Sequence, residues 1–175
     1  VIDGGALDLA GLEAVARDRR ELALSEGARE AVRASRAVVD RAVARGDVVY
    51  GVTTGFGSFA EVRIADERLR ELQVNLVRSH AAGTGPEVER EVVRALQLLR
   101  LATLATGRTG VRPETAQAYA QLISDNLTPV VHEYGSLGCS GDLAPLAHCA
   151  LALMGEGPVR DAEGNLTTFQ HPVTL

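Results

Sequence analysis

Apolar residues recur at helical spacing along most of this chain. Repeats three and four residues apart place them on one helix face, and capping residues or glycines mark the limits of each run. The pattern predicts six helices, which begin after Asp8, after Ser25, at Asp66, at Pro86, at Pro113 and at Leu143. Residues expected to end the last five are Gly46, Gly83, Gly107, Asn126 and Gly155. The predicted fold class is therefore mainly α, with short strands and Gly-rich loops.

Two stretches interrupt the helical pattern. Val48–Phe59 begins with a β-like run and continues into a Gly-rich loop, and Gly135–Asp142 is a run of small residues directly before a helix. Irregular loops held by a rigid scaffold commonly carry function, so both are candidate site segments. A third irregular stretch, Asp161–Asn165, is expected to form a hairpin turn.

Composition narrows the function classes. The chain has 175 residues, 46% of them hydrophobic, which predicts one globular domain with a real core. All 18 basic residues are Arg, so neither Schiff-base lysine chemistry nor a P-loop lysine is available within this chain. The net charge of −5 disfavours nucleic acid, and the sequence contains no polybasic block, membrane-length apolar run or signal peptide.

Cysteine and histidine usage points away from metal chemistry. Cys139 and Cys149 lie in an apolar stretch, which fits a reducing compartment, and we expect a cytoplasmic protein. His132 and His171 have no partner at metal-ligand spacing, so no metal site is expected. The spacing of Gly51, Gly55 and Gly57 differs from known phosphate loops, so no bound nucleotide is expected.

The Gly135–Asp142 run allows two interpretations from its residues alone. It is a common turn with Asp142 as a helix cap, or it is a tripeptide able to cyclise. In the second interpretation the Gly141 amide nitrogen attacks the Cys139 carbonyl carbon, and loss of water from the ring and from Ser140 leaves a methylidene group. A helix that begins directly afterwards would favour negative charge developing on such an electrophile.

Three motifs, in the same order along the chain, resemble one enzyme family. Residues 50–57 read Tyr-Gly-Val-Thr-Thr-Gly-Phe-Gly, residues 72–83 read Leu-Gln-Val-Asn-Leu-Val-Arg-Ser-His-Ala-Ala-Gly, and residues 135–148 read Gly-Ser-Leu-Gly-Cys-Ser-Gly-Asp-Leu-Ala-Pro-Leu-Ala-His. Together they resemble the histidine and aromatic amino-acid ammonia-lyases and their aminomutase relatives. The resemblance implies that the cofactor, the methylidene-imidazolone group MIO (5-methylidene-imidazol-4-one), forms from Cys139-Ser140-Gly141.

The resemblance also implies the catalytic roles. Ser140 supplies the methylidene carbon, Cys139 and Gly141 complete the ring, and Tyr50 is the base that removes the substrate's β-hydrogen. The alternative for Tyr50 is a strand-end residue that packs against its loop.

Further residues are implied as substrate-binding or supporting groups. Ser79 and His80 match the histidine-specific pattern, in which the histidine contacts the substrate imidazole; a histidine on a helix face otherwise has a structural role. The supporting candidates for hydrogen bonds are Asn75, Arg78, Asp142 and Gly57. For Asp142, simple helix capping is an equal alternative, and His148 is expected to be a buried, hydrogen-bonded residue.

The sequence departs from the family pattern at several points. Cys139 stands where Ala is usual, and we hypothesise that the ring still forms, because that side chain is not part of it. His132 and Tyr134 also differ. The chain lacks later segments of the family, so residues 1–175 are expected to be one N-terminal domain that is inactive alone and belongs to a homotetramer.

The leading interpretation is a carbon–nitrogen lyase of histidine breakdown that converts L-histidine to urocanate and ammonia. Its expected partners are a small amino-acid substrate and other copies of the chain, with neither nucleic acid nor membrane. Two alternatives remain: an aromatic amino-acid 2,3-aminomutase, and a non-catalytic, truncated helical module whose tripeptide stays unmodified.

Overall fold

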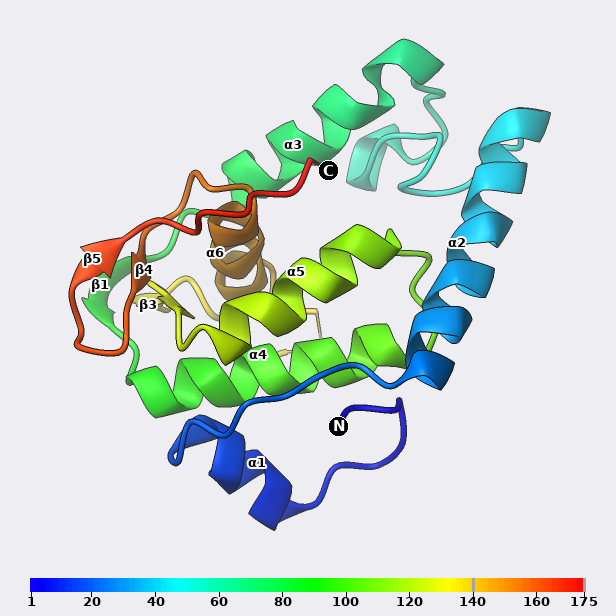
Figure 1. Ribbon diagram of the computed structural model, residues 1–175. Helices are drawn as coiled ribbons and strands as arrows, with labels where there is room; N and C mark the ends of the chain where they lie inside the picture. Colours follow the sequence, from blue (N-terminus) through cyan, green and yellow to red (C-terminus); the bar gives the residue numbers. More distant parts are fainter. Residues whose placement is uncertain (140, 175) are drawn as a thin grey trace.

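Helices dominate the computed structural model, which describes residues 1–139 and 141–174 (Figure 1). The α-helices are α1 (Leu9–Ala16), α2 (Glu26–Arg45), α3 (Leu69–His80), α4 (Arg90–Ala105), α5 (Pro113–Ser124) and α6 (Leu143–Leu153). Short 3-10 turns cover Gly57–Phe59 and Asp66–Arg68. The prediction of a mainly α fold is confirmed.

Two small antiparallel sheets connect the helices. In the first, β1 (Thr84–Glu87) pairs with β3 (His132–Tyr134). In the second, β4 (Val159–Arg160) lies between β2 (Thr128–Pro129) and β5 (Leu166–Thr167). The Asp161 carboxylate accepts a hydrogen bond from the Asn165 amide at 2.8 Å, which closes the β4–β5 hairpin at the predicted turn.

The core is centred on α4 and α5, with α1 and α2 packed against α4. Its most deeply buried side chains are aliphatic, and full burial of each contributes roughly 1.5–3 kcal/mol. They include Leu98, Leu101, Leu122, Ile123 and Leu153, all at most 2% exposed. Because α3 packs on α6, this scaffold holds the segment around Ser79 and His80 against the helix that follows the small-residue loop.

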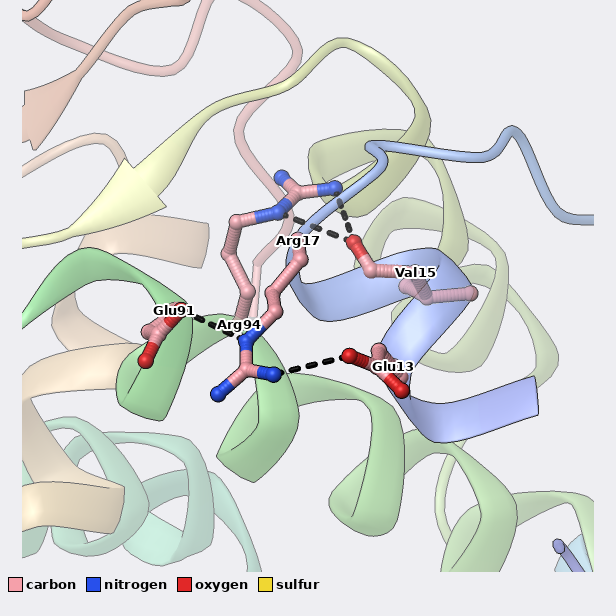
Figure 2. Close-up of polar contacts among 5 residues, drawn as sticks. All are labelled: Glu13, Val15, Arg17, Glu91 and Arg94. Carbon is pink, nitrogen blue, oxygen red and sulfur yellow. Dashed lines mark hydrogen bonds and ion pairs between the residues drawn. The ribbon is translucent and has the colours of Figure 1, made fainter. Parts of the chain in front are cut away.

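A buried arginine joins α1 to α4 (Figure 2). The Arg94 guanidinium, only 2% exposed, donates two hydrogen bonds to the Val15 carbonyl at 3.1 and 2.8 Å. That carbonyl lies at the C-terminal end of α1, where a cation interacts favourably with the helix dipole. On the surface beside it, Arg17 bridges Glu13 and Glu91, at 2.7 and 2.9 Å.

Helix limits with local capping chemistry match the prediction. The Ser25 hydroxyl accepts a hydrogen bond from the Ala28 amide at 3.0 Å at the start of α2, and Gly46 ends α2 with φ +70°. The third predicted helix starts slightly late, since Asp66–Arg68 is a 3-10 turn before Leu69.

Two local predictions are wrong. Pro86 does not begin a helix: it lies in β1, and α4 begins four residues later at Arg90. The run that begins at Val48 forms no strand, because the Thr53 hydroxyl bonds to the Asp47 carbonyl and accepts from the Val49 amide, which curls the segment into turns. Among the residues the structure covers, no helix combines the length and apolarity that crossing a bilayer requires.

Candidate active site

Asp142 organises the Gly135–Asp142 loop. It occupies the N-cap position of α6, but its side chain makes no capping bond to that helix. Instead its carboxylate accepts hydrogen bonds from the Ser136 hydroxyl and from the amides of Leu137, at 3.1 Å, and Gly138, at 3.2 Å. The Ser136 and Leu137 bonds are the main reasons that the pKa of Asp142 lies below its usual value. Capping by the side chain is therefore wrong, and the carboxylate supports the loop.

The tripeptide region is open to solvent on both sides of Ser140, which itself lies outside the described residues. Cys139 is exposed. Gly141 has φ +70°, a conformation that glycine adopts at little cost, and a Cβ added there would meet nothing within 4 Å. The first amides of α6 follow directly, and such amides lack acceptors within their own helix. The space beside the Gly141 Cα is therefore open.

The Tyr50 loop is a chain of turns tied to α3. The Tyr50 residue is 62% exposed, and its ring meets the Phe56 ring edge-on, with 5.8 Å between the ring centroids. Its hydroxyl accepts a hydrogen bond from the Gly57 amide at 3.3 Å. Gln73 of α3 donates to the Gly51 carbonyl at 3.0 Å. Tyr50 is thus held through its loop with most of its ring free, and no strand precedes it.

Ser79 and His80 end α3. The Ser79 hydroxyl donates to the Leu76 carbonyl at 2.9 Å, and His80 Nδ1 lies 2.8 Å from the same oxygen. The Ser79 hydroxyl also lies 3.0 Å from Nδ1. Because a carbonyl only accepts, a hydrogen bond from Nδ1 to Leu76 requires the hydrogen on Nδ1, and Nε2 of a neutral ring then keeps its lone pair. Asn75 is exposed on the same helix, and no hydrogen bond joins its side chain to another described residue. Arg78 instead forms a two-bond ion pair with Glu156, at 2.7 and 2.8 Å, beyond the end of α6.

His148 links the segment after His80 to α6. Its Nε2 accepts a hydrogen bond from the Gly83 amide at 3.0 Å, so the prediction of a hydrogen-bonded histidine is confirmed, although the side chain is half-buried. Partial burial, and secondly the neighbouring His132, lower its pKa. His132 lies 5.6 Å away, ring to ring, and its Nδ1 is 2.9 Å from the Gly85 carbonyl.

Close glycine packing brings two of the three motifs together. A Cβ on Gly135 would lie 3.1 Å from the Gly83 Cα and 3.1 Å from the Ala144 Cβ. The end of the His80 motif therefore lies directly against the base of the Asp142 loop.

The Tyr50 loop lies apart from that loop. In Figure 1 the cyan residues between α2 and α3 are at one corner of the molecule, whereas the yellow segment that leads into α6 is near β3 and α5. No hydrogen bond between described residues joins the two segments. One copy of this chain thus brings the His80 end together with the Asp142 loop, whereas the segment between α2 and α3, which carries Tyr50, lies apart from the segment that leads into α6 (Figure 1).

The sequence interpretation missed three residues that position the site: Ser136, Gly83 and Gln73. Ser136 had a local signal, since a hydroxyl six residues before an aspartate in a small-residue loop is a natural donor. Gly83 and Gln73 had none, because each acts across the fold. Within the described residues, no group of three His, Cys, Asp or Glu side chains could hold a metal ion.

Comparisons with known proteins agree on one family. The family model described as aromatic amino acid lyase matches residues 7–170. Among curated relatives, histidine ammonia-lyase from Streptomyces coelicolor is 63% identical over 151 residues, covering 86% of this chain and 29% of the relative. That from Streptomyces griseus is 59% identical over 153 residues, covering 87% and 30%. The chain thus spans about 30% of the length of these relatives.

Solved structures are similar over nearly the whole chain. Histidine ammonia-lyase from Trypanosoma cruzi superposes with a TM-score of 0.87 at 32% identity, covering 99% of this chain and 35% of that one. Tyrosine aminomutase from Streptomyces globisporus gives a TM-score of 0.87 at 36% identity, covering 95% and 31%.

Proposed function

We propose, since this chain belongs to the aromatic amino acid lyase family, that it supplies part of the active site of a histidine ammonia-lyase. The reaction removes ammonia from L-histidine and leaves urocanate. The observation that carries this assignment is the 63% identity with the Streptomyces coelicolor histidine ammonia-lyase, which spans all three site motifs.

The residues around Ser140 fit an MIO group formed from Cys139-Ser140-Gly141. Gly141 has the free space and the left-handed backbone described above, and Asp142 ties down the loop just before the tripeptide. Once formed, the group supplies an electrophilic carbon that binds the substrate's amino group and makes ammonia a better leaving group. The amides at the start of α6 favour negative charge in their vicinity.

His80 is the proposed contact for the substrate side chain. With its hydrogen on Nδ1 directed to Leu76, His80 offers an Nε2 lone pair that can accept a hydrogen bond from an imidazole N–H. Gly83 and His148 keep this end of α3 next to the Asp142 loop.

Tyr50 is the proposed base for the substrate's β-hydrogen. The Gly57 amide donates to its oxygen, and an N–H donor in that position stabilises negative charge on the oxygen. Because the Tyr50 loop is remote from the Asp142 loop in one copy, we propose that Tyr50 of one subunit completes the site of another. A homotetramer would meet that requirement. We assign the protein to the cytoplasm, where the free thiols of Cys139 and Cys149 remain reduced.

The test combines mass spectrometry and product analysis on the full-length enzyme. Peptide mapping across Gly135–His148 should find the mass of two waters missing from residues 139–141, and Ser140→Ala should restore the unmodified mass and abolish urocanate formation. Ser58→Ala, a change outside the tripeptide, is the matched control. An unmodified wild-type peptide would refute the proposal and support the non-catalytic module.

The second candidate is an aromatic amino-acid aminomutase. It is favoured by the likeness to tyrosine aminomutase, whose identity of 36% is nevertheless far below the 63% of the histidine ammonia-lyase relative. Chromatography of the products separates the two, because an aminomutase yields a β-amino acid and a lyase yields urocanate with free ammonia.

A further inference from the structure

A groove on the side of the fold away from α6 gathers arginines. It has a volume of about 420 Å³ and lies between α2, α3 and the segment that joins α4 to α5. Its apolar wall includes Val39, Val43, Leu104 and Val111. Its four cationic lining residues are Arg36, Arg70, Arg100 and Arg112.

Acidic side chains lie beside the arginine groove and not in its lining: an adjoining hollow shares Arg36, Arg70 and Arg112 with it and is also lined by Asp40 and Glu114. No Asp or Glu is among its lining residues. Arg36 pairs with Asp40 at 2.8 Å, just outside, but the side chains of Arg70, Arg100 and Arg112 form neither an ion pair nor a hydrogen bond with any described residue. Elsewhere on this chain of net charge −5, Arg78 and Arg160, for example, each form two hydrogen bonds to a glutamate.

The groove is built from elements far apart in sequence. Arg36 comes from α2, Arg70 from α3, Arg100 from α4, and Arg112 directly precedes α5 and is half-buried. The wall near Arg112 is held in place, since the Gly110 amide donates to the Ser35 hydroxyl of α2 at 2.9 Å. Arginines from several elements therefore line one groove that has an apolar wall.

We propose that the arginine groove binds a small molecule that carries a phosphate group on an apolar body. Guanidinium groups bind phosphate oxygens through paired hydrogen bonds, and a phosphate monoester brings close to two negative charges to match several cations, where a single carboxylate brings one. The volume is in the range of small-molecule sites and leaves room beyond a phosphate for an apolar part against Val39 and Leu104.

The bound molecule also touches the loop that carries Tyr50. Gly51 and Val52 line the groove, together with Gln73, which donates to the Gly51 carbonyl. Occupancy therefore restrains the backbone next to Tyr50. The consequence for turnover rests on the proposed function, but the binding itself does not.

Binding is tested by calorimetry on the full-length enzyme at constant ionic strength. The probes are phenyl phosphate, inorganic phosphate and citrate. Phenyl phosphate should bind saturably and more tightly than either other probe. Arg112→Ala, and Arg100→Ala at an exposed position, should each weaken the affinity for phenyl phosphate at least tenfold. Arg41→Ala, which removes an arginine of α2 outside the groove, should change its affinity less than twofold.

Hydrogen exchange gives a readout that needs no catalysis. Phenyl phosphate should slow amide exchange in a peptide covering residues 48–57 in the wild type and not in Arg100→Ala. Absence of saturable binding, tighter binding of citrate, or equal losses in all three variants would overturn the proposal. Binding that persists in a protein that forms no urocanate would refute the proposed function alone.

Discussion

Gly83 is the position where adding one methyl group gives the sharpest test of the site's packing. A Cβ there would lie 2.9 Å from His148 Nε2, 3.3 Å from His148 Cδ2 and 3.4 Å from His132 Cβ. Carbon contacts are optimal near 3.5–4.0 Å, so the His148 ring must move by roughly 0.5 Å. That movement lengthens and weakens the 3.0 Å hydrogen bond from the Gly83 amide.

The expected cost of Gly83→Ala follows from these two effects. Weakening of the hydrogen bond costs at most about 1 kcal/mol, and overpacking costs about 1–3 kcal/mol, so the free energy of unfolding should fall by about 1–4 kcal/mol. Urea denaturation followed by far-UV circular dichroism measures this change, and it suits a protein without tryptophan.

Two controls isolate the cause. Gly27→Ala makes the same chemical change on exposed helix α2, where the nearest atom is 4.0 Å away, and should stabilise the protein by about 0.5 kcal/mol. In a His148→Ala background, which removes the ring, Gly83→Ala should cost at least about 1 kcal/mol less than in the wild type. If Gly83→Ala is neutral, or if its cost is unchanged by His148→Ala, the packing argument fails.

Three further predictions concern titration, thiol reactivity and the core. Because the pKa of His148 is lowered from 6.5 in the folded state, the neutral ring's contribution to stability is fully present above pH 6.5 and is lost as the pH falls below it. On acidification the urea midpoint should therefore drop less in His148→Gln than in the wild type, and equal drops would contradict this. Iodoacetamide should label exposed Cys139 in the native protein, whereas Cys149, whose pKa burial raises to about 11, should react only in urea, as peptide mapping would reveal. Leu122→Ala, at a fully buried position, should lower the free energy of unfolding by about 2–5 kcal/mol. Leu99→Ala, at a half-exposed position, should lower it by less than about 1 kcal/mol, and similar losses for the two variants in urea denaturation would contradict the assigned core.

Helix α2 was predictable from sequence because its limits depend on neighbouring residues. The Ser25 hydroxyl caps an amide three residues away, and Gly46 takes the left-handed conformation that ends a helix. Both effects depend only on groups within one helical turn. The hairpin closed by Asp161 was predictable for the same reason.

Pro86 shows where local preference is insufficient. Proline favours a first helical turn, but Pro86 lies in β1, whose pairing with β3 spans more than forty residues of chain. The β-branched residues after Val48 have the converse problem. They favour a strand, but their pairing is limited to an isolated antiparallel bridge between Thr54 and Arg63, and Thr53 closes the residues before it into turns.

The sequence by itself determined the mainly α class, the candidate loops and the ability of the tripeptide at 139–141 to cyclise, because each depends on residue type and short-range spacing. The chemistry expected of Tyr50 and His80 came from the resemblance of their motifs to a known family. Only the tertiary structure decided that His148 reaches Gly83, 65 residues away. It alone placed the segment between α2 and α3, which carries Tyr50, apart from the segment that leads into α6 (Figure 1). Such relations depend on how helices pack, and packing sums many weak contacts between distant residues that no local pattern records.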